Sequence, residues 1–465
     1  MRAQLRKTAE QLRASYWFLP SLMALGAMVL SFAMISLDTV VGTEWMDQQS
    51  WLRAARPDGA RQVLSAIGGS MITVAGTVFS VTIAAVVYAS GQYGPRLLTN
   101  FMEDRGNQVT LGTFIATYLY CLLVVRTIRT AEEARAETGL QAASGFVPNL
   151  ALLVGVVLAL CSIAVLIFFI HHVPSRIHIN SVIEHIGRQL LAGIPTRFPK
   201  FMGDDARPEH LRGGSPQVPA EVRRIASQET GYLQVLDDTT LLRVATRNEV
   251  MLHLRFQPGD YVHVGRVLLE AWPASRVSEE DEEALRACFG LGSRRTALQD
   301  LGFLLDELVE IASRAMSPGT NDPFTAITCL DWLGAVLADL SRRALPDPLR
   351  MDERGAPRLL THPPRFEDYL ARSFGTLRQY VAGDRLVSLH FLRALAEVAV
   401  VCEDADRLAL LGREADLLVE QAGTRLTGEL LEQVRARADR LRHALRDPAA
   451  RRRLCDPEQA PGAVA

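Results

Sequence analysis

Hydrophobic residues divide this chain into two halves of different character. Four long apolar segments lie before residue 175, and a charged region follows residue 200. About 20 consecutive apolar residues are enough for a helix to cross a bilayer core, and each segment approaches that length. The pattern therefore predicts a transmembrane domain over residues 1–175, with helices near residues 18–37, 71–90, 109–128 and 150–170.

The second predicted helix carries a row of hydroxyl side chains. They recur at steps of three, four and three residues, which places them on one helix face: Ser70, Thr73, Thr77 and Ser80. Gly69 and Gly76 lie beside this row and would allow another backbone to come close. Such a face either packs against a neighbouring helix or lines a water-filled path, and the sequence leaves both interpretations open.

A short charged link joins the second and third predicted helices. Pro95 can begin an amphipathic helix there, and Arg96, Asp104 and Arg105 supply charges. The link is either an elbow at the lipid interface or an element that couples the soluble part of the chain to the membrane hairpin. Asp322, in the turn SPGTNDPF, is a further candidate for coupling, and either Asn321 or Asp322 can cap a new helix there.

The region after the fourth apolar segment is expected to be cytosolic and of the α+β class. Residues 176–202 predict an amphipathic connector, which lies on the membrane surface or docks below it. Residues 203–225 contain the clearest linker, and residues 226–275 alternate short strands with turns. Residues 280–445 show helical periodicity, and residues 446–465 are expected to be disordered.

The strand-rich section contains the string GDYVHVGRVLLEAW. This string looks like the hairpin of biotinyl-type and lipoyl-type barrels, so the section is predicted to be small and barrel-like. The chain's two lysines, Lys7 and Lys200, both precede it, which excludes a carrier lysine there and a GxxxxGK[ST] phosphate loop. A formal net charge of -2 gives no reason to expect nucleic acid as a partner.

Metal and cofactor chemistry find little support in the sequence. The six cysteines are scattered and make no CxxC pair, so neither a disulfide framework nor a thiolate zinc site is expected. A reducing compartment suits the soluble half. Four histidines cluster around the end of the fourth apolar segment, at His171, His172, His178 and His185. Boundary histidines of this kind are ordinary, and we predict no metal and no cofactor.

A group of carboxylates offers the one argument for an enzyme. The acids recur along one predicted helix and continue after the turn that ends it, at Asp300, Asp306, Glu307, Glu310, Asp322 and Asp331. Paired acids can perform acid–base chemistry or hold a divalent cation. No serine elbow or glycine-rich phosphate loop accompanies them, so a solvated helix face with helix caps is the favoured interpretation.

Long strings of the chain resemble a bacterial family of predicted membrane proteins, the domain-of-unknown-function family twenty-two fifty-four. The resemblance lies in residues 69–128 and in the later strings QPGDYVHVG, RRTALQDLGF and SPGTNDPFTAITCLDWLG, and it extends to about residue 440. It implies an inner-membrane protein with a cytosolic carboxy-terminal part. It implies no activity and no functional residues.

These features predict a multi-pass protein of the bacterial inner membrane, with the lipid bilayer as its surroundings. Both termini are expected to be cytoplasmic, because arginine and lysine are slightly more frequent on that side. The favoured hypothesis is a channel-like or transport protein for an ion or small solute. In it the hydroxyl face lines a path built by several subunits of a homo-oligomer, and the cytosolic part regulates opening.

Two other classes stay open. One is a membrane-anchored sensor or scaffold whose cytosolic part binds a partner while the membrane hairpin only packs. The other is an enzyme acting on a lipid or envelope substrate, which rests on Asp300, Glu307 and Asp322 alone.

Overall fold

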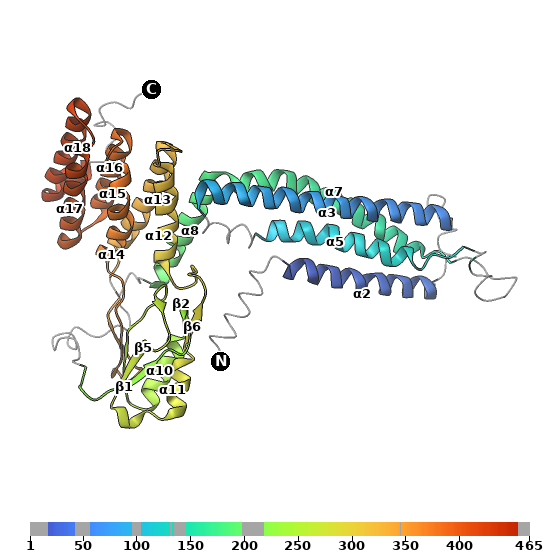
Figure 1. The fold of residues 1–465 in the computed structure, drawn as a ribbon, viewed down its shortest axis with the longest axis horizontal. Coiled ribbons are helices and arrows are strands. Elements are labelled where there is room, and N and C mark those ends of the chain that lie inside the picture. Colours follow the sequence, from blue (N-terminus) through green and yellow to red (C-terminus); the bar gives the residue numbers. More distant parts are fainter. Residues whose placement is uncertain are drawn as a thin grey trace. The chain divides into compact units, whose positions relative to one another are not determined.

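The computed structural model describes residues 17–41, 56–94, 104–130, 133, 146–197, 218–344 and 346–453. The protein is mostly helical, with a mixed α/β region in its second half (Figure 1). It divides into two compact units, an N-terminal unit that ends at His178 and a C-terminal unit that begins at Ile179.

Long helices make up the N-terminal unit: α2 (Phe18–Val41), α3 (Pro57–Tyr93), α5 (Arg105–Val125) and α7 (Asn149–Ile177). Helix α5 is the central one and packs against the other three (Figure 1). Its Phe114, Tyr120 and Cys121 are at most 1% exposed. Gly112 lets α2 approach α5, because an added Cβ would lie 2.6 Å from the sulfur of Met23.

Several polar groups inside this bundle pair across helices. Asp38 on α2 is 8% exposed, and its two carboxylate oxygens each accept a 2.9 Å bond from a backbone N–H in the first turn of α7. The hydroxyl of Tyr120 donates to a carbonyl of the same turn at 2.9 Å. Because α7 lacks a capping side chain of its own, Asp38 supplies the missing acceptor across the bundle.

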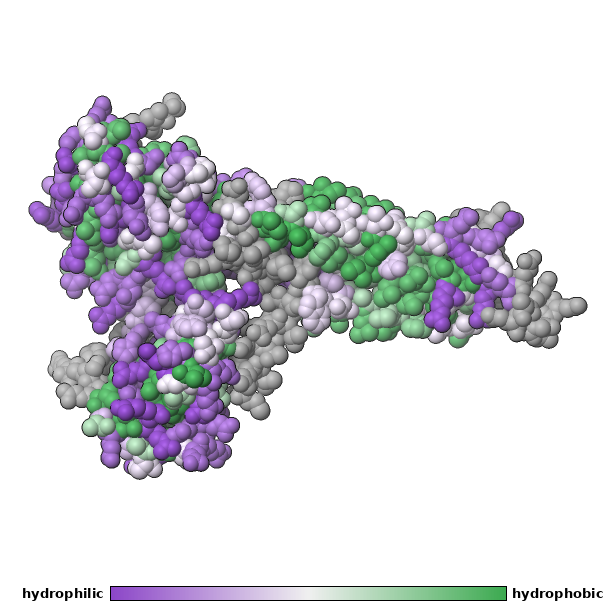
Figure 2. Space-filling view, viewed as in Figure 1, coloured by the Kyte–Doolittle hydropathy of each residue, from purple (hydrophilic) through white to green (hydrophobic). Residues whose placement is uncertain are grey.

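Apolar side chains cover much of the outer surface of the N-terminal unit (Figure 2). Helix α7 alone exposes Leu160, Ile163, Ile167 and Ile170 to half or more. By length and composition, five described helices are able to cross a membrane: α2, α3, α5, α7 and, in the C-terminal unit, α13 (Pro323–Ser341).

The C-terminal unit starts with α8 (Ile179–Arg197), one residue after α7 ends. This amphipathic helix buries its apolar side against α12 (Leu301–Ala315) and α13, through Val182, Ile183, Ile186, Leu190 and Ile194. The contact is close, since a Cβ added to Gly187 would overlap the indole ring of Trp332 on α13. The expected amphipathic helix is present, and protein covers its apolar side.

Two β-sheets follow α8 in the chain. The larger has the strand order β1-β5-β3-β8-β7 and the smaller β4-β2-β6. Their bounds are β1 Arg223–Ala226, β2 Gly231–Leu236, β3 Met251–Leu254, β4 Tyr261–Val262, β5 Val267–Trp272, β6 Phe289–Gly292, β7 Leu349–Met351 and β8 Pro357–Leu360. Neighbouring strands are antiparallel except β3 and β8, which are parallel.

Neither sheet closes on itself, so the barrel-like section predicted from the sequence is wrong in this respect. The reason is that β3 pairs with β8, which comes from about 100 residues further along the chain. Strands β6, β7 and β8 all belong to the region predicted to be helical. Short helices α10 (Asp238–Arg247) and α11 (Glu279–Arg286) pack against the strands, and η2 (Ala274–Arg276) lies between β5 and α11.

The remaining helices build an α-helical part around α13. They are α14 (Phe366–Leu370), the π-helix η3 (Ala371–Gly375), α15 (Thr376–Val381), α16 (Arg385–Val401), α17 (Ala405–Ala422), α18 (Gly428–Arg446) and α19 (Pro448–Arg453). Helix α13 packs against α8, α12 and α16. Asp322 caps its first turn, and its Cys329, Leu330 and Leu333 are fully buried.

Candidate functional site

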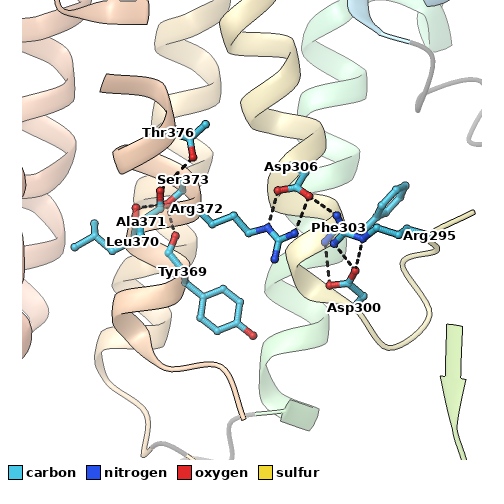
Figure 3. Close-up of polar contacts among 10 residues, drawn as sticks. All are labelled: Arg295, Asp300, Phe303, Asp306, Tyr369, Leu370, Ala371, Arg372, Ser373 and Thr376. Atoms are coloured by element: carbon cyan, nitrogen blue, oxygen red, sulfur yellow. Dashed lines mark hydrogen bonds and ion pairs between the residues drawn. The ribbon is translucent and has the colours of Figure 1, made fainter. Parts of the chain in front are cut away.

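A cluster of arginines and carboxylates lies where the β-strands meet α12 in the C-terminal unit (Figure 3). Asp300 precedes α12 and caps it, accepting the N–H of Phe303 at 3.2 Å. The second oxygen of Asp300 accepts hydrogen bonds from the guanidinium of Arg295. Arg295 also donates to Asp306, nearly two turns further along the helix, at 2.5 Å.

A second arginine reaches Asp306 from another part of the chain. Arg372 donates through Nε at 2.6 Å and Nη2 at 2.9 Å, so its guanidinium binds both carboxylate oxygens (Figure 3). Arg372 belongs to the π-helix η3, where one extra residue per turn changes the direction of the side chains. Asp306 therefore lies between two guanidinium groups and links α12 to η3. Bidentate contacts of this kind are among the stronger hydrogen bonds in proteins.

Two glycines permit this close arrangement. Gly259, in the turn before β4, has φ +100°, and a Cβ there would overlap the carboxylate of Asp300. A Cβ at Gly302 would lie 2.6 Å from Nη1 of Arg372. The turn also carries Asp260, which accepts the N–H of Gln257 at 2.8 Å. The strings QPGDYVHVG and RRTALQDLGF, distant in the sequence, thus meet at one cavity of about 70 Å³.

The cluster shifts the pKa values of its acids in opposite directions. Burial alone would raise the pKa of Asp306, but the hydrogen bonds from Arg372 and Arg295 outweigh it, and the net pKa is lowered. Burial raises the pKa of Asp260, and the charge of nearby Asp300 raises it further against the opposing effects of Gln257 and the arginines. Asp306 is therefore held ionised, whereas ionised Asp260 is disfavoured.

A groove of about 1100 Å³ opens beside the cluster. It lies between α10, the chain that follows β3 and the β7–β8 hairpin, and it shares Gln257, Pro258, Asp260 and Pro364 with the smaller cavity. No group of three or more His, Cys, Asp or Glu side chains suited to a metal ion occurs among the described residues.

The chain matches the family model described as "Predicted membrane protein (DUF2254)" over residues 13–397. The chain belongs to the DUF2254 family. It is also similar to uncharacterized proteins of Mycobacterium bovis and Mycobacterium tuberculosis, each 31% identical over 419 residues, which cover 89% of this chain and 77% of the relative. No solved structure matches it. The resemblance predicted from the sequence is confirmed, and the protein is a membrane protein.

The predicted pore residues of this DUF2254 protein lie on the side of α3 that faces away from α5 and α7. Each is exposed, and each hydroxyl donates to the carbonyl four residues earlier, with distances of 2.6 Å for Ser70, 2.9 Å for Thr73, 3.1 Å for Thr77 and 2.9 Å for Ser80. A Cβ added to Gly69 or Gly76 would meet nothing within 4 Å. The hydroxyls thus share one face, and the described helices of a single copy leave that face uncovered.

The predicted coupling residues that the structure describes are divided between the two units. Asp104 caps α5 and contacts His172 on α7 at 3.0 Å, inside the N-terminal unit. Arg105 is the exposed first residue of α5, and Arg96 lies outside the described residues. Asp322 belongs to the C-terminal unit, where it caps α13 by accepting from the backbone and hydroxyl of Thr325.

Of the acids considered for catalysis, Asp300 and Asp306 meet at the guanidinium of Arg295, whereas Asp322 does not join them. Asp300 and Asp322 precede two successive helices, α12 and α13, and the 15 residues of α12 separate them by roughly 20 Å along its axis. Glu307 is 2% exposed within α12. Sequence reasoning included Asp300 and Asp306 but missed Arg295 and Arg372, because the Arg372–Asp306 pair spans 66 residues. The string RRTALQD, which places Arg295 five residues before Asp300, was the sequence signal that could have identified the Arg295–Asp300 pair.

Proposed function

We propose that this protein is a channel-like or transport protein of the bacterial inner membrane, in which several copies combine their α3 helices around a polar path. An ion or small solute would cross along Ser70, Thr73, Thr77 and Ser80. The observation that carries the proposal is the outward hydroxyl face of α3. Polar residues within a membrane usually face protein or water instead of lipid, so a face of this kind calls for other copies of the chain.

We infer that four of the five candidate helices cross the bilayer and that α13 does not. In the apolar 18-residue stretch of α13, 56% of the residues are buried inside the protein, compared with 44% in α5, 28% in α3 and 17% in α2 and α7. Neighbouring helices surround α13, so lipid is not needed to cover it. Four crossings would place both termini on the same side, and the slight excess of arginine and lysine makes that side the cytoplasm. Free, buried cysteines in the C-terminal unit, Cys288 and Cys402, are compatible with a reducing compartment.

The C-terminal unit would regulate the path through α8. Helix α8 begins one residue after α7 ends, and it is buried against α12, the helix that bears Asp306. Leu301 at the start of α12 lies close to Gly193 of α8, where an added Cβ would come within 2.6 Å of it. A shift of the cluster around Asp306 would therefore move α12 and, through α8, the end of a membrane helix.

Solute flux into liposomes that contain the purified protein tests the proposal. The variant Thr77→Leu removes a hydroxyl from the α3 face, and Thr113→Leu makes the same change on α5, where Thr113 forms the same type of bond to Val109 at 2.8 Å. We expect flux from the native protein, reduced flux from Thr77→Leu and native flux from Thr113→Leu. Absence of flux, or equal flux from both variants, contradicts the proposal.

A membrane-anchored sensor is the second candidate, and the groove of about 1100 Å³ favours it. In that case the α3 face would only hold copies together, and the C-terminal unit would bind a ligand or partner. Liposomes would then show no flux, whereas the protein would still form oligomers. Measurement of flux and of oligomer mass on one preparation separates the two candidates.

A further inference from the structure

The groove beside α10 opens the hydrophobic core of the β-rich part to solvent. Leu254 and Leu359 are buried members of that core, and Leu236, Leu242 and Phe256 pack against it while partly exposed. All five side chains line the groove. A groove of about 1100 Å³ is large enough for a small molecule, since such sites are usually about 300–1,000 Å³ and mainly apolar.

Arginines dominate the rim of the groove: Arg243, Arg247, Arg255, Arg350 and Arg354. Arg247 is paired with Asp281 and Arg255 with Glu270, and neither acid lines the groove. Within the described residues Arg243 and Arg354 have no ion pair, and Arg243 donates only to the hydroxyl of Thr240 at 3.0 Å. At least two guanidinium groups at the rim are therefore available to an anion.

The acids that line the groove are mostly engaged already. Asp352 has 2% of its side chain exposed, and it accepts from Arg358 at 2.8 Å and from two backbone N–H groups. Asp238 accepts from the backbone of Thr239 at 2.7 Å at the start of α10, where the helix dipole offsets its charge. Asp260 accepts from its own turn. Glu353, exposed at the hairpin, is the acid left to oppose the free arginines.

We propose that this groove binds an anionic small molecule with an apolar body. The body would lie on the floor formed by Leu242, Phe256 and Leu359, and its anionic group would bind Arg243 and Arg354. Arginine suits this task because its planar guanidinium donates two parallel hydrogen bonds to an oxyanion. Bound ligand would also press on the turn that holds Asp260, which borders the Asp300–Arg295 pair. That consequence rests on the regulatory role proposed above, whereas binding itself does not.

Fluorescence titration of the full chain in nanodiscs tests the proposal, with 1-anilinonaphthalene-8-sulfonate as the probe. This probe joins an aromatic body to a sulfonate, and N-phenyl-1-naphthylamine provides the same body without charge. The rim variants are Arg243→Glu and Arg354→Glu, both at exposed positions. Arg435→Glu, at an exposed position on α18, is the matched control, and empty nanodiscs give the lipid background.

We expect one saturable component of sulfonate binding in the native protein and in Arg435→Glu, with loss of that component in both rim variants. Binding of the uncharged probe should be the same in the native protein and in the rim variants. Equal binding by the native protein and the rim variants, or binding no greater than that of empty nanodiscs, overturns the proposal. A competing anionic amphiphile should displace the probe. If dimerisation of the protein displaces it instead, the groove binds a second copy of the chain, and the proposal is overturned. None of these results depends on solute flux.

Discussion

The close contact between α8 and α13 makes Gly187 the most informative position for substitution. Replacement by alanine adds one methyl group, and its Cβ would overlap the rigid indole ring of Trp332. Overpacking of this kind costs about 1–3 kcal/mol. Alanine also favours the helix by about 1 kcal/mol relative to glycine, which offsets part of that cost.

Gly193→Ala provides the matched control on the same helix. Its Cβ would lie 2.6 Å from Cδ2 of Leu301, the end of a side chain that can rotate away. Because both variants gain the same helix propensity, their difference isolates the crowding against Trp332. We expect Gly187→Ala to be less stable than Gly193→Ala by about 1–2 kcal/mol.

Alkylation of Cys329 measures this difference in the intact protein. Cys329 is fully buried on α13, close to Trp332, and reacts only when the helices around it separate. If Gly187→Ala lowers the free energy of unfolding by about 1.4 kcal/mol, the alkylation rate of Cys329 should rise about tenfold. Mass spectrometry of the peptide that contains Cys329 measures this rate. Cys288, buried among the strands, should keep its rate. Equal Cys329 rates in the two glycine variants would refute the docking of α8 on α13.

Further predictions concern buried charges and the α3 face. Arg407 donates to three carbonyls at the end of α13, so Arg407→Met should lower the free energy of unfolding by about 3 kcal/mol, measured by thermal unfolding in detergent. Asp306→Asn should destabilise the protein by about 2 kcal/mol at neutral pH. The pKa of Asp306 is lowered by folding, so this difference should disappear as the pH falls through that pKa. Asp260→Asn should instead stabilise the protein at neutral pH, because folding raises the pKa of Asp260 and ionisation there opposes folding. Unfolding curves of both variants at several pH values check that the two stability changes have opposite signs. Gly76→Leu should leave thermal stability in detergent unchanged but reduce the oligomer mass in native mass spectrometry. Gly68→Leu should destabilise each copy, because α5 packs against Gly68 and leaves no room for a side chain as large as leucine.

Periodicity along the sequence was enough to predict where the long helices lie and which residues share a face. The steps between Ser70, Thr73 and Thr77 placed their hydroxyls together because an α-helix repeats every 3.6 residues. Pro323 predicted a helix start capped by Asn321 or Asp322, and the structure has Asp322 as the cap. These features depend only on neighbours in the chain.

Features that depend on distant partners could not be predicted. Arg372 meets Asp306 across 66 residues, and a π-helix, which has no reliable sequence signal, sets its direction. Strands β7 and β8 have three and four residues and lie among helices, so their alternation was too short to recognise. Because β8 pairs with β3 beside the predicted hairpin, the sheet stays open where a barrel was expected.

Reactivity of single cysteines on α3 tests the central claim most directly. In a background with Cys161 and Cys455 replaced by serine, Thr77→Cys is compared with Val157→Cys on α7, where an apolar residue is exposed on the outer surface. A water-soluble methanethiosulfonate reagent is applied to intact membranes. The account predicts rapid modification at position 77 and none at position 157. An unreactive cysteine at position 77 that instead forms disulfides between copies would mean that the α3 face is a dry contact, which contradicts the proposed path.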